Sequence, residues 1–385
     1  MIKTDIAIVG GGITGLWLHS LLKARGYQAL LFEKSRLGSG QTLASQGMIH
    51  GGLKYNLDGV TGSASETISS MPDIWRACLS GESDVDLSDV GCVAWQYHIF
   101  SDGRFGNKLS AFLGSRALRG GPRMLSRREL PPPFNNDEFK GVVYEIPDLV
   151  LDTPSLIQTL AKTDRNDLIE AKASPIPQEG PGINSLILED GTKIKAKYFI
   201  FAAGIGNEEL IAESNISVAT QRRGLHQVLV KGTLPFLNGH AVSLRSKDKP
   251  RFTVTSYRMN SKTIWYLGGD LAETGVERGS KDQIDFTKQE LNQFLPSIDI
   301  ETCEITTLRI ERAEPRDRNK LRPDRPSCVR DGNVIVCWPI KLTLVPLLAE
   351  KVLAQITLSS PNSGASDTSM LKKAQVGAYP WDNLL

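Results

Sequence analysis

The sequence contains no apolar run of the roughly 20 residues that a membrane-spanning helix requires. Its first apolar run is interrupted by Gly10 to Gly12, which is typical of a strand entering a turn and not of a secretory signal peptide. These two absences predict a protein of the cytoplasm. A peripheral contact with the inner face of a membrane stays open.

Cysteine is scarce, with 5 cysteines among 385 residues, at positions 78, 92, 303, 328 and 337. Their number is odd and they are scattered, with no Cys-x-x-Cys pair. A disulfide framework is therefore not expected, nor is a metal site built on cysteine. The pattern predicts no bound metal and fits a reducing compartment.

An excess of charge of one sign is also missing. The 45 lysines and arginines nearly balance the 43 aspartates and glutamates, which gives a net charge of +2. This balance offers no support for a nucleic-acid partner. Hydrophobic residues make up 40% of the chain, an ordinary globular proportion, and the length suffices for about two domains.

The start of the chain carries the pattern of a dinucleotide-binding unit. Residues 5–9 form an apolar strand that runs into Gly10-Gly11-Gly12-Ile13-Thr14-Gly15. A helix is predicted over residues 16–25 and a second strand over residues 29–32. A structural glycine turn is the alternative, but the motif lies between two strands, which favours a dinucleotide site.

Each glycine of this motif has a separate reason to lack a side chain. Gly10 permits the tight turn, Gly12 lets the backbone approach a pyrophosphate, and Gly15 lets the helix pack on the strand. The N-terminus of the helix offers N–H groups and a partial positive charge to the phosphates. Glu33 ends the second strand, where a carboxylate accepts hydrogen bonds from the adenosine ribose and repels the 2′-phosphate of NADP.

Small and hydrogen-bonding residues dominate the stretch 39–55, Ser-Gly-Gln-Thr-Leu-Ala-Ser-Gln-Gly-Met-Ile-His-Gly-Gly-Leu-Lys-Tyr. Such a composition suits a loop wrapped around a ligand better than it suits a core. A long surface loop is the alternative. The glycine turn, the acid and this loop together resemble the FAD-dependent oxidoreductases of the D-amino-acid oxidase superfamily. The nearest branches are FAD-linked glycerol-3-phosphate dehydrogenase and L-2-hydroxyglutarate dehydrogenase, whose loops end in similar strings.

The resemblance implies FAD as the cofactor and assigns most of its contacts to the first 48 residues. The residues implied there are Gly10, Gly12, Ile13, Thr14, Gly15, Glu33, Lys34, Ser39, Thr42, Ser45, Gln46, Gly47 and Met48.

Two later segments extend the implied cofactor site. The apolar strand that ends in Phe-Ala-Ala-Gly at residues 201–204 resembles the second nucleotide-touching turn of the superfamily, which implies contacts from Ala203 and Gly204. A buried strand that ends in Ala-Ala-Gly by chance is the alternative. Ala173, at the end of another predicted strand, is assigned to the adenine.

Near the C-terminus, a strand, a turn and an apolar helix follow one another over residues 333–356. The turn resembles the Gly-Gly-Lys-Leu-Thr-Thr stretch of the glycerol-3-phosphate dehydrogenases, although Trp338-Pro339-Ile340 replaces the glycine pair. The resemblance implies cofactor contacts from Ile340, Leu342 and Thr343. A helix N-terminus aimed at the flavin would stabilise negative charge on the reduced ring.

The predicted fold class is α/β, with a Rossmann-like FAD-binding domain of the glutathione-reductase type and a second α+β substrate domain. Residues 1–60, 142–215 and 309–358 are assigned to the first domain, and residues 61–141 and 216–308 to the second. Alternating strands over residues 226–230, 241–244, 253–257 and 263–267 predict a mainly antiparallel sheet in the second domain. Residues 359–385 are predicted to be a flexible tail.

Beside the flavin ring, the resemblance places His50, whose titration range suits a catalytic base at neutral pH. A structural histidine is the alternative. The family positions point to Lys54, Arg312 and Lys341 for anion binding, with Tyr55 as a hydroxyl donor. Further candidates, each explained as well by a solvated face, are Arg222, Arg223, His226, Tyr257 and Arg258.

The sequence thus predicts an FAD-dependent dehydrogenase or oxidase that takes a hydride from a small anionic substrate, a 2-hydroxy acid or hydroxy-phosphate, to flavin N5. Oxidation of an amino acid or amine is the alternative within the superfamily. A flavoprotein that acts on a macromolecule, or binds FAD without turnover, is the alternative from another class. The electron acceptor, whether oxygen, a quinone or a carrier protein, stays open.

Overall fold

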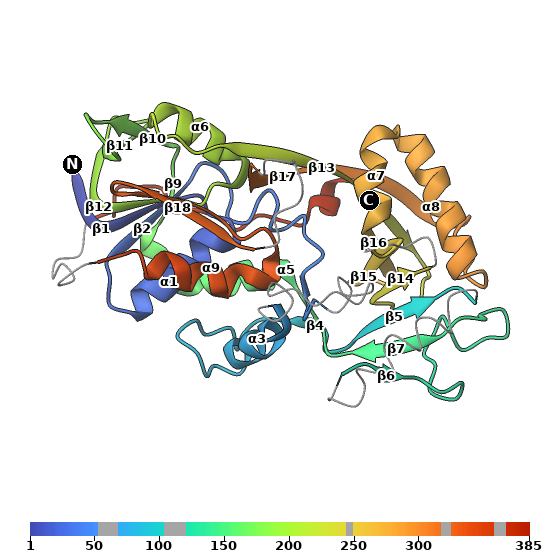
Figure 1. Cartoon of the computed structure of the whole chain (residues 1–385). Coiled ribbons are helices and arrows are strands. Elements are labelled where there is room, and N and C mark those ends of the chain that lie inside the picture. Colours follow the sequence, from blue (N-terminus) through green and yellow to red (C-terminus); the bar gives the residue numbers. More distant parts are fainter. Residues whose placement is uncertain (53–67, 104–120, 244–248, 317–324, 358–366) are drawn as a thin grey trace.

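The computed structural model describes residues 1–52, 68–103, 121–243, 249–316, 325–357 and 367–385. In these residues the chain forms two lobes, each built on a sheet of eight strands (Figure 1). The N-terminus lies at the far end of the first lobe, and the C-terminus lies on the second (Figure 1). Lys54 and Tyr55, which the sequence assigns to anion binding, lie outside the described residues.

The sheet of the first lobe has the order β10-β11-β12-β1-β2-β9, and β19 and β18 extend it beside the C-terminal half of β12. The five strands β9, β2, β1, β12 and β19 run parallel. The strands are β1 (Ile2–Val9), β2 (Ala29–Glu33), β9 (Leu168–Glu170), β10 (Ala173–Pro177), β11 (Ile183–Leu188), β12 (Lys193–Phe201), β18 (Ser327–Asp331) and β19 (Val334–Trp338).

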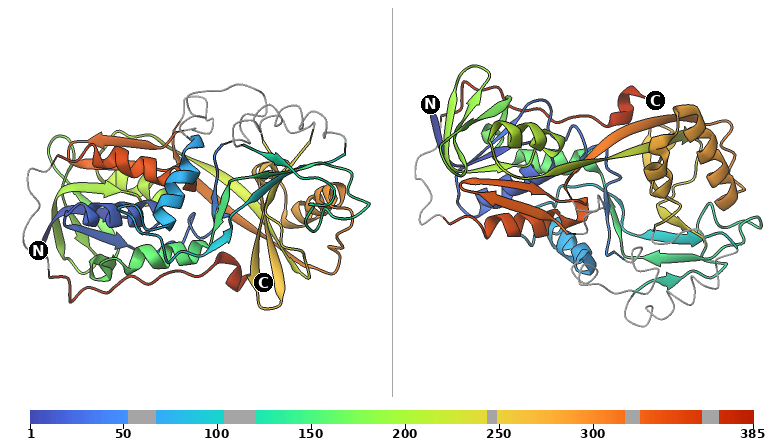
Figure 2. Two further views of the ribbon diagram at one scale, coloured as in Figure 1. Left: turned by 90° about the horizontal axis from the view of Figure 1, so that it is seen from below. Right: turned by 45° about the horizontal axis from the view of Figure 1, so that its top comes forward.

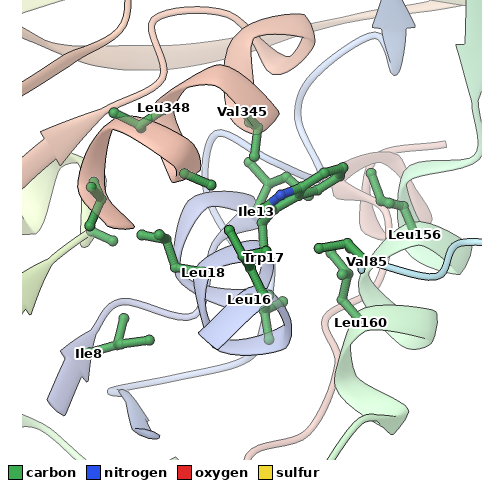
Figure 3. Close-up of a cluster of buried hydrophobic side chains, with 14 of the residues drawn as sticks. Ile8, Ile13, Leu16, Trp17, Leu18, Val85, Leu156, Leu160, Val345 and Leu348 are labelled. Atoms are coloured by element: carbon green, nitrogen blue, oxygen red, sulfur yellow. The ribbon is translucent and has the colours of Figure 1, made fainter. Parts of the chain in front are cut away.

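Both faces of this parallel sheet are buried, because alternate residues of its apolar strands point to opposite sides. In β1, Ile6 and Ile8 face one core, whereas Ala7 and Val9 face the other. The first core lies under three helices, α1 (Ile13–Ala24), α5 (Thr153–Lys162) and α9 (Val345–Leu353). Figure 3 shows Leu16 and Trp17 of α1 beside Leu156 and Leu160 of α5 and Val345 and Leu348 of α9. The short helix α6 (Asn207–Glu213) lies on the second core.

The sheet of the second lobe has the order β17-β13-β16-β15-β14-β5-β7-β6 and is antiparallel except between β14 and β5. Helix α8 (Ser280–Phe294) covers one face, where Phe294 packs on Phe100 and Phe252. The strands are β5 (Tyr97–Ser101), β6 (Arg123–Met124), β7 (Val143–Ile146), β13 (Thr220–Gly232), β14 (Gly239–Val242), β15 (Phe252–Met259), β16 (Lys262–Gly268) and β17 (Glu304–Pro315). The predicted fold class is therefore confirmed.

A small antiparallel sheet of β3 (Met48–Ile49), β8 (Leu149–Leu151) and β4 (Cys92–Ala94) lies beside α3 (Met71–Leu79). Trp75 of α3 packs against Trp17 of α1, with ring centroids 4.8 Å apart. This contact fixes α3 to the first core.

Two segments assigned by sequence to the first domain belong to the sheet of the second lobe. Strand β7 pairs with β5 and β6. Residues 309–315 continue β17, which pairs with β13 from Thr220 to Lys231. The β13–β17 ribbon reaches over the first lobe (Figure 1). The boundaries differ from those expected because strand pairing, which local pattern does not encode, decides which sheet a strand joins.

The expectation of a flexible tail over residues 359–385 is also wrong for its described part. Residues 367–385 hydrogen-bond to the first lobe, where Leu37 bridges to Val376 and Ile169 to Lys373. Trp381 is only 2% exposed. Residues 359–366 lie outside the described part.

No helix in the described part of the chain combines the length and the apolar character that crossing a bilayer requires.

Candidate functional site

A cavity of about 780 Å³ lies between the glycine turn of the first lobe and the β13–β17 ribbon of the second. Most of the residues that the sequence assigned to the cofactor or the substrate line this cavity. They are Gly10, Gly12, Ile13, Thr14, Glu33, Lys34, Ser39, Thr42, Ser45, Gln46, Met48, His50, Ala173, Ala203, Gly204, Arg312, Ile340, Lys341 and Leu342. The segments that supply them are far apart in the sequence.

The glycines of the turn between β1 and α1 serve two purposes, close packing of the helix and space for a ligand. A Cβ on Gly15 would lie 1.9 Å from the carbonyl oxygen of Gly10, so Gly15 serves the packing of α1 on the turn and does not line the cavity. A Cβ on Gly12 would meet only Thr42 Oγ1, at 3.3 Å, among the described atoms within 4 Å. Because Gly12 lines the cavity, the missing side chain leaves room for a ligand.

The N-terminus of α1 is directed at this space. Helices leave their first N–H groups without partners inside the helix, and these groups carry a partial positive charge. The N–H of Ile13 donates to Thr42 Oγ1 (3.0 Å), which fixes the loop of Thr42 to the start of the helix. Thr14 lies beside it on the wall. The arrangement fits a pyrophosphate.

Glu33 is held at the end of β2 by three hydrogen bonds. Its Oε2 accepts one from Gly11 N–H (2.7 Å), and its Oε1 accepts one from Ser35 N–H (2.9 Å) and one from the Ser35 hydroxyl (3.0 Å). Each carboxylate oxygen has about two lone-pair positions, so Oε2 retains capacity for a hydroxyl of a ribose. Lys34 and Ala173 line the same end of the cavity.

The loop that precedes β3 is fixed by the second lobe. The side-chain amide of Gln46 donates to Tyr266 O (2.8 Å), and Thr253 Oγ1 donates to Gln46 Oε1 (2.6 Å). Gly47 does not line the cavity. A Cβ there would lie 2.2 Å from Leu151 O, so Gly47 lets the loop pack closely on β8.

His50 is buried on the cavity wall, directly after β3. Its carbonyl oxygen accepts a hydrogen bond from Thr343 Oγ1 (3.2 Å). The carbonyl of Thr343 in turn accepts one from the indole N–H of Trp75 (3.1 Å). Thr343 is therefore behind the wall, where it ties the turn before α9 to the backbone of His50.

The turn after β19 contributes Trp338, Pro339, Ile340, Lys341 and Leu342 to the wall. Ile340 has a φ of +66°, in the left-handed region that a β-branched residue rarely adopts. A glycine occupies the corresponding place in the string that this turn resembles. The backbone of Ile340 thus adopts a conformation that favours glycine although the side chain is bulky, and this conformation costs about 1–3 kcal/mol.

This strain leads to a prediction at Ile340. The variants Ile340→Gly and Ile340→Ala both remove most of the side chain, but only glycine relieves the positive φ. Glycine usually costs about 0.5–1 kcal/mol relative to alanine in regular structure. Here we expect the glycine variant to be the more stable by about 1 kcal/mol in urea unfolding. A less stable glycine variant would contradict this conformation.

Charged groups of both signs meet where the β13–β17 ribbon borders the cavity. Arg312 Nη1 lies 3.1 Å from Glu273 Oε1, and Lys249 Nζ lies 2.6 Å from Glu273 Oε2. Asp270, at the start of the short helix α7 (Asp270–Thr274), lines the same region. We call Lys249, Asp270, Glu273 and Arg312 the charged cluster.

Burial affects two members of the charged cluster in opposite directions. Desolvation lowers the pKa of Arg312, while the neighbouring Glu273 raises it. Desolvation also raises the pKa of Asp270 above that of an exposed carboxyl. The Nε–H of Arg312 has no hydrogen-bond partner among the described residues. A guanidinium stays protonated in proteins, so Arg312 brings a positive charge to the cavity wall.

Five further sequence candidates do not line the cavity. Arg222 pairs with Glu208 and Glu311, and Arg223 pairs with Glu314. Arg258 is exposed over the ring of Phe236.

The other two of these candidates are buried behind the wall. His226 Nδ1 lies 2.9 Å from Gly275 O, on the face of β13 opposite to Leu225 and Gln227, which line the cavity. Successive residues of a strand alternate between its two faces, which explains the difference. The hydroxyl of Tyr257 donates to Gln46 O (3.1 Å).

Several wall residues were not predicted from the sequence. They are Gln41, Gln227, Lys249, Thr253, Asp270, Glu273 and Trp338. The run Gly268-Gly269-Asp270 between a strand and a helix was the one available signal, since glycines at such a place permit close approach of a ligand. The others come from strands whose inward face depends on pairing.

Residues 5–350 match the model of a family described as FAD dependent oxidoreductase. A probable FAD-dependent oxidoreductase of Pseudomonas aeruginosa is 41% identical over 359 residues, which cover 92% of this chain and 91% of that protein. Its crystal structure superimposes with a TM-score of 0.84 over 100% of this chain and 98% of that one, at 35% identity.

More distant solved structures share the fold. Glycine oxidase from Geobacillus kaustophilus has a TM-score of 0.65 at 18% identity, covering 95% of this chain and all of that one. L-α-glycerophosphate oxidase from Mycoplasma pneumoniae, solved with FAD bound, has a TM-score of 0.66 at 15% identity, with coverage of 98% and 100%.

Proposed function

Because this chain belongs to the FAD-dependent oxidoreductase family, we propose that it oxidises a small substrate bearing a carboxylate or phosphate, a 2-hydroxy acid or a hydroxy-phosphate. The chain is an enzyme and uses FAD. The observation that carries the proposed substrate class is the position of Arg312, whose guanidinium brings a positive charge to the cavity wall. Lys249 and Lys341 line it as well.

The residues of the cavity fit FAD. Gly12 would leave space for the pyrophosphate, the start of α1 would bind it, and Glu33 would accept the ribose hydroxyls. The loop from Ser39 to Met48 and the turn at Ile340 would then surround the rest of the cofactor. The bound flavin supplies the acceptor for a hydride from the substrate carbon.

The protein must bind the substrate and accept the proton of its hydroxyl group. Oxidation of an alcohol to a carbonyl removes one hydride from carbon and one proton from oxygen, so a base would have to lie near that oxygen. We propose His50 for this proton, because it lines the cavity and its backbone is fixed by Thr343. Lys54 and Tyr55 stay proposals for anion binding.

An amino acid or amine is the second candidate substrate. Glu273 and Asp270 place carboxylates on the wall beside Arg312 and Lys249. A site with both signs suits a zwitterion, whose ammonium would pair with a carboxylate and whose carboxylate would pair with the guanidinium. The proposed oxidation would then form an imine.

Matched compounds decide between the two candidates. We expect 2-hydroxyglutarate, glutamate or glycerol-3-phosphate to bleach the flavin without oxygen, at roughly 450 nm where oxidised flavins absorb, and glutarate and glycerol not to bleach it. Glutarate and glycerol are the controls, since the first lacks the reacting group and the second lacks the anion. Bleaching by glycerol as fast as by glycerol-3-phosphate would contradict an anion requirement.

A further inference from the structure

The last described segment, residues 367–385, runs from the first lobe to the second (Figure 2). Two of its residues line the cavity. On the first lobe, the N–H of Gly377 donates to Leu37 O (2.9 Å). The next residues, Ala378 and Pro380, belong to the cavity wall. The C-terminal segment is thus part of the site.

Four aromatic rings join this segment to the sheet of the second lobe. Tyr379 and Trp381 are stacked, with centroids 4.2 Å apart and planes at 17°. The Trp381 ring also packs against Tyr257 of β15 (5.0 Å) and Tyr266 of β16 (5.1 Å). We call these four residues the aromatic cluster. Trp381 forms its buried centre.

The two tyrosines from the sheet also hydrogen-bond to the backbone of the cavity loop. The hydroxyl of Tyr266 lies within hydrogen-bond distance of both Ala44 O (2.7 Å) and Gln227 Oε1 (2.5 Å), and Tyr257 Oη donates to Gln46 O (3.1 Å). Burial raises the pKa of both hydroxyls, so each stays a protonated donor at neutral pH. Ala44 and Gln46 line the cavity within the loop implied to contact FAD.

The aromatic cluster is also fixed to the first lobe. The hydroxyl of Tyr379 hydrogen-bonds to Asp152. Asp152 caps the N-terminus of α5, where its Oδ2 accepts a hydrogen bond from Ser155 N–H (2.9 Å). One side of the cluster therefore rests on a helix of the FAD-binding lobe, and the other rests on the sheet of the second lobe.

We infer that Tyr379 and Trp381 are positioning residues of the FAD site. Their rings pack against Tyr257 and Tyr266, and the hydroxyls of these two tyrosines fix the loop 44–46 in the conformation that binds the cofactor. In their absence, FAD has to order the loop when it binds. Ordering of mobile groups on binding reduces affinity without removing any direct contact.

The test uses the full chain with Trp381→Ala. We expect FAD affinity, measured by flavin fluorescence on adding FAD to the apoprotein, to fall by roughly tenfold to a hundredfold. Hydrogen–deuterium exchange of the FAD-loaded protein should rise in residues 42–48. Met370→Ala is the matched control, because Met370 lies in the same segment and is 94% exposed. It should leave both measurements unchanged.

Two further variants separate positioning from simple loss of stability. Trp381→Phe keeps an aromatic ring and should restore most of the FAD affinity. Tyr266→Phe keeps the ring packing but removes the hydroxyl that holds Ala44, and should weaken FAD binding severalfold. If Trp381→Ala lowers the unfolding temperature but leaves FAD affinity and loop exchange unchanged, the inference is overturned. If Trp381→Ala does not fold, unchanged affinity in Tyr266→Phe overturns it instead.

Discussion

A Gly12→Ala variant is expected to fold like the wild type but to bind FAD roughly a hundredfold more weakly. The added Cβ would meet only Thr42 Oγ1, at 3.3 Å, among the described atoms within 4 Å. The free energy of unfolding of the apoprotein should therefore change by no more than about 1 kcal/mol. The methyl group instead occupies space on the cavity wall that the pyrophosphate needs.

Gly15→Ala is the matched comparison, because the same methyl group is added three residues further on. Its Cβ would lie 1.9 Å from Gly10 O, so the turn and α1 have to separate. We expect this apoprotein to lose stability by about 1–3 kcal/mol or more. Gly12→Ala should therefore lose mainly FAD affinity, measured by FAD titration. Gly15→Ala should lose mainly stability, measured by urea unfolding. Equal FAD affinity in Gly12→Ala and the wild type would place the pyrophosphate elsewhere.

The second large effect is expected at Arg312. Arg312→Met keeps the length of the side chain but removes the charge that we propose for the substrate anion. We expect kcat/KM to fall roughly a hundredfold to a thousandfold, as for the loss of a charged partner in a buried site. FAD affinity should stay close to that of the wild type. The measurement is the rate of anaerobic flavin reduction against substrate concentration.

Two companion variants give this experiment its controls. Arg312→Lys keeps the charge but loses the planar fork, so we expect an intermediate loss. Glu273→Gln removes the carboxylate that pairs with Arg312 and Lys249. If the substrate is an amino acid, Glu273→Gln should strongly weaken substrate binding, because the ammonium loses its carboxylate partner. With a 2-hydroxy acid, the effect should be small. An Arg312→Met enzyme with unchanged kcat/KM would exclude Arg312 from substrate binding.

Only one member of the charged cluster was predicted from the sequence. Arg312 was predicted, because its position corresponds to a family segment. Lys249, Asp270 and Glu273 were not, since nothing near them in the sequence marks an inward face. Conversely, Arg222 and Arg223 were candidates because of their charge, yet carboxylates of the fold already pair with them.

The aromatic cluster was equally hidden. Its members come from β15, β16 and the C-terminal segment, and their composition gave no sign that they meet. Residues 359–385 were predicted to be a flexible tail, because Ser, Gly, Asn and Asp are frequent in their first part. The end of the segment is nevertheless ordered, because Tyr379 and Trp381 pack with Tyr257 and Tyr266 of the second lobe.

The sequence by itself determined the family, the cofactor and the first strand–turn–helix–strand unit of the first lobe. These depend on short segments, above all the turn from Gly10 to Gly15 and Glu33, in which neighbours along the chain carry the chemistry. Only tertiary structure brings the charged cluster and the C-terminal segment to the cavity wall. There, the contacts join residues from 24 to more than 300 positions apart, such as Lys249 with Glu273 and Leu37 with Gly377. Strand pairing and side-chain packing set such contacts, and local pattern does not encode them.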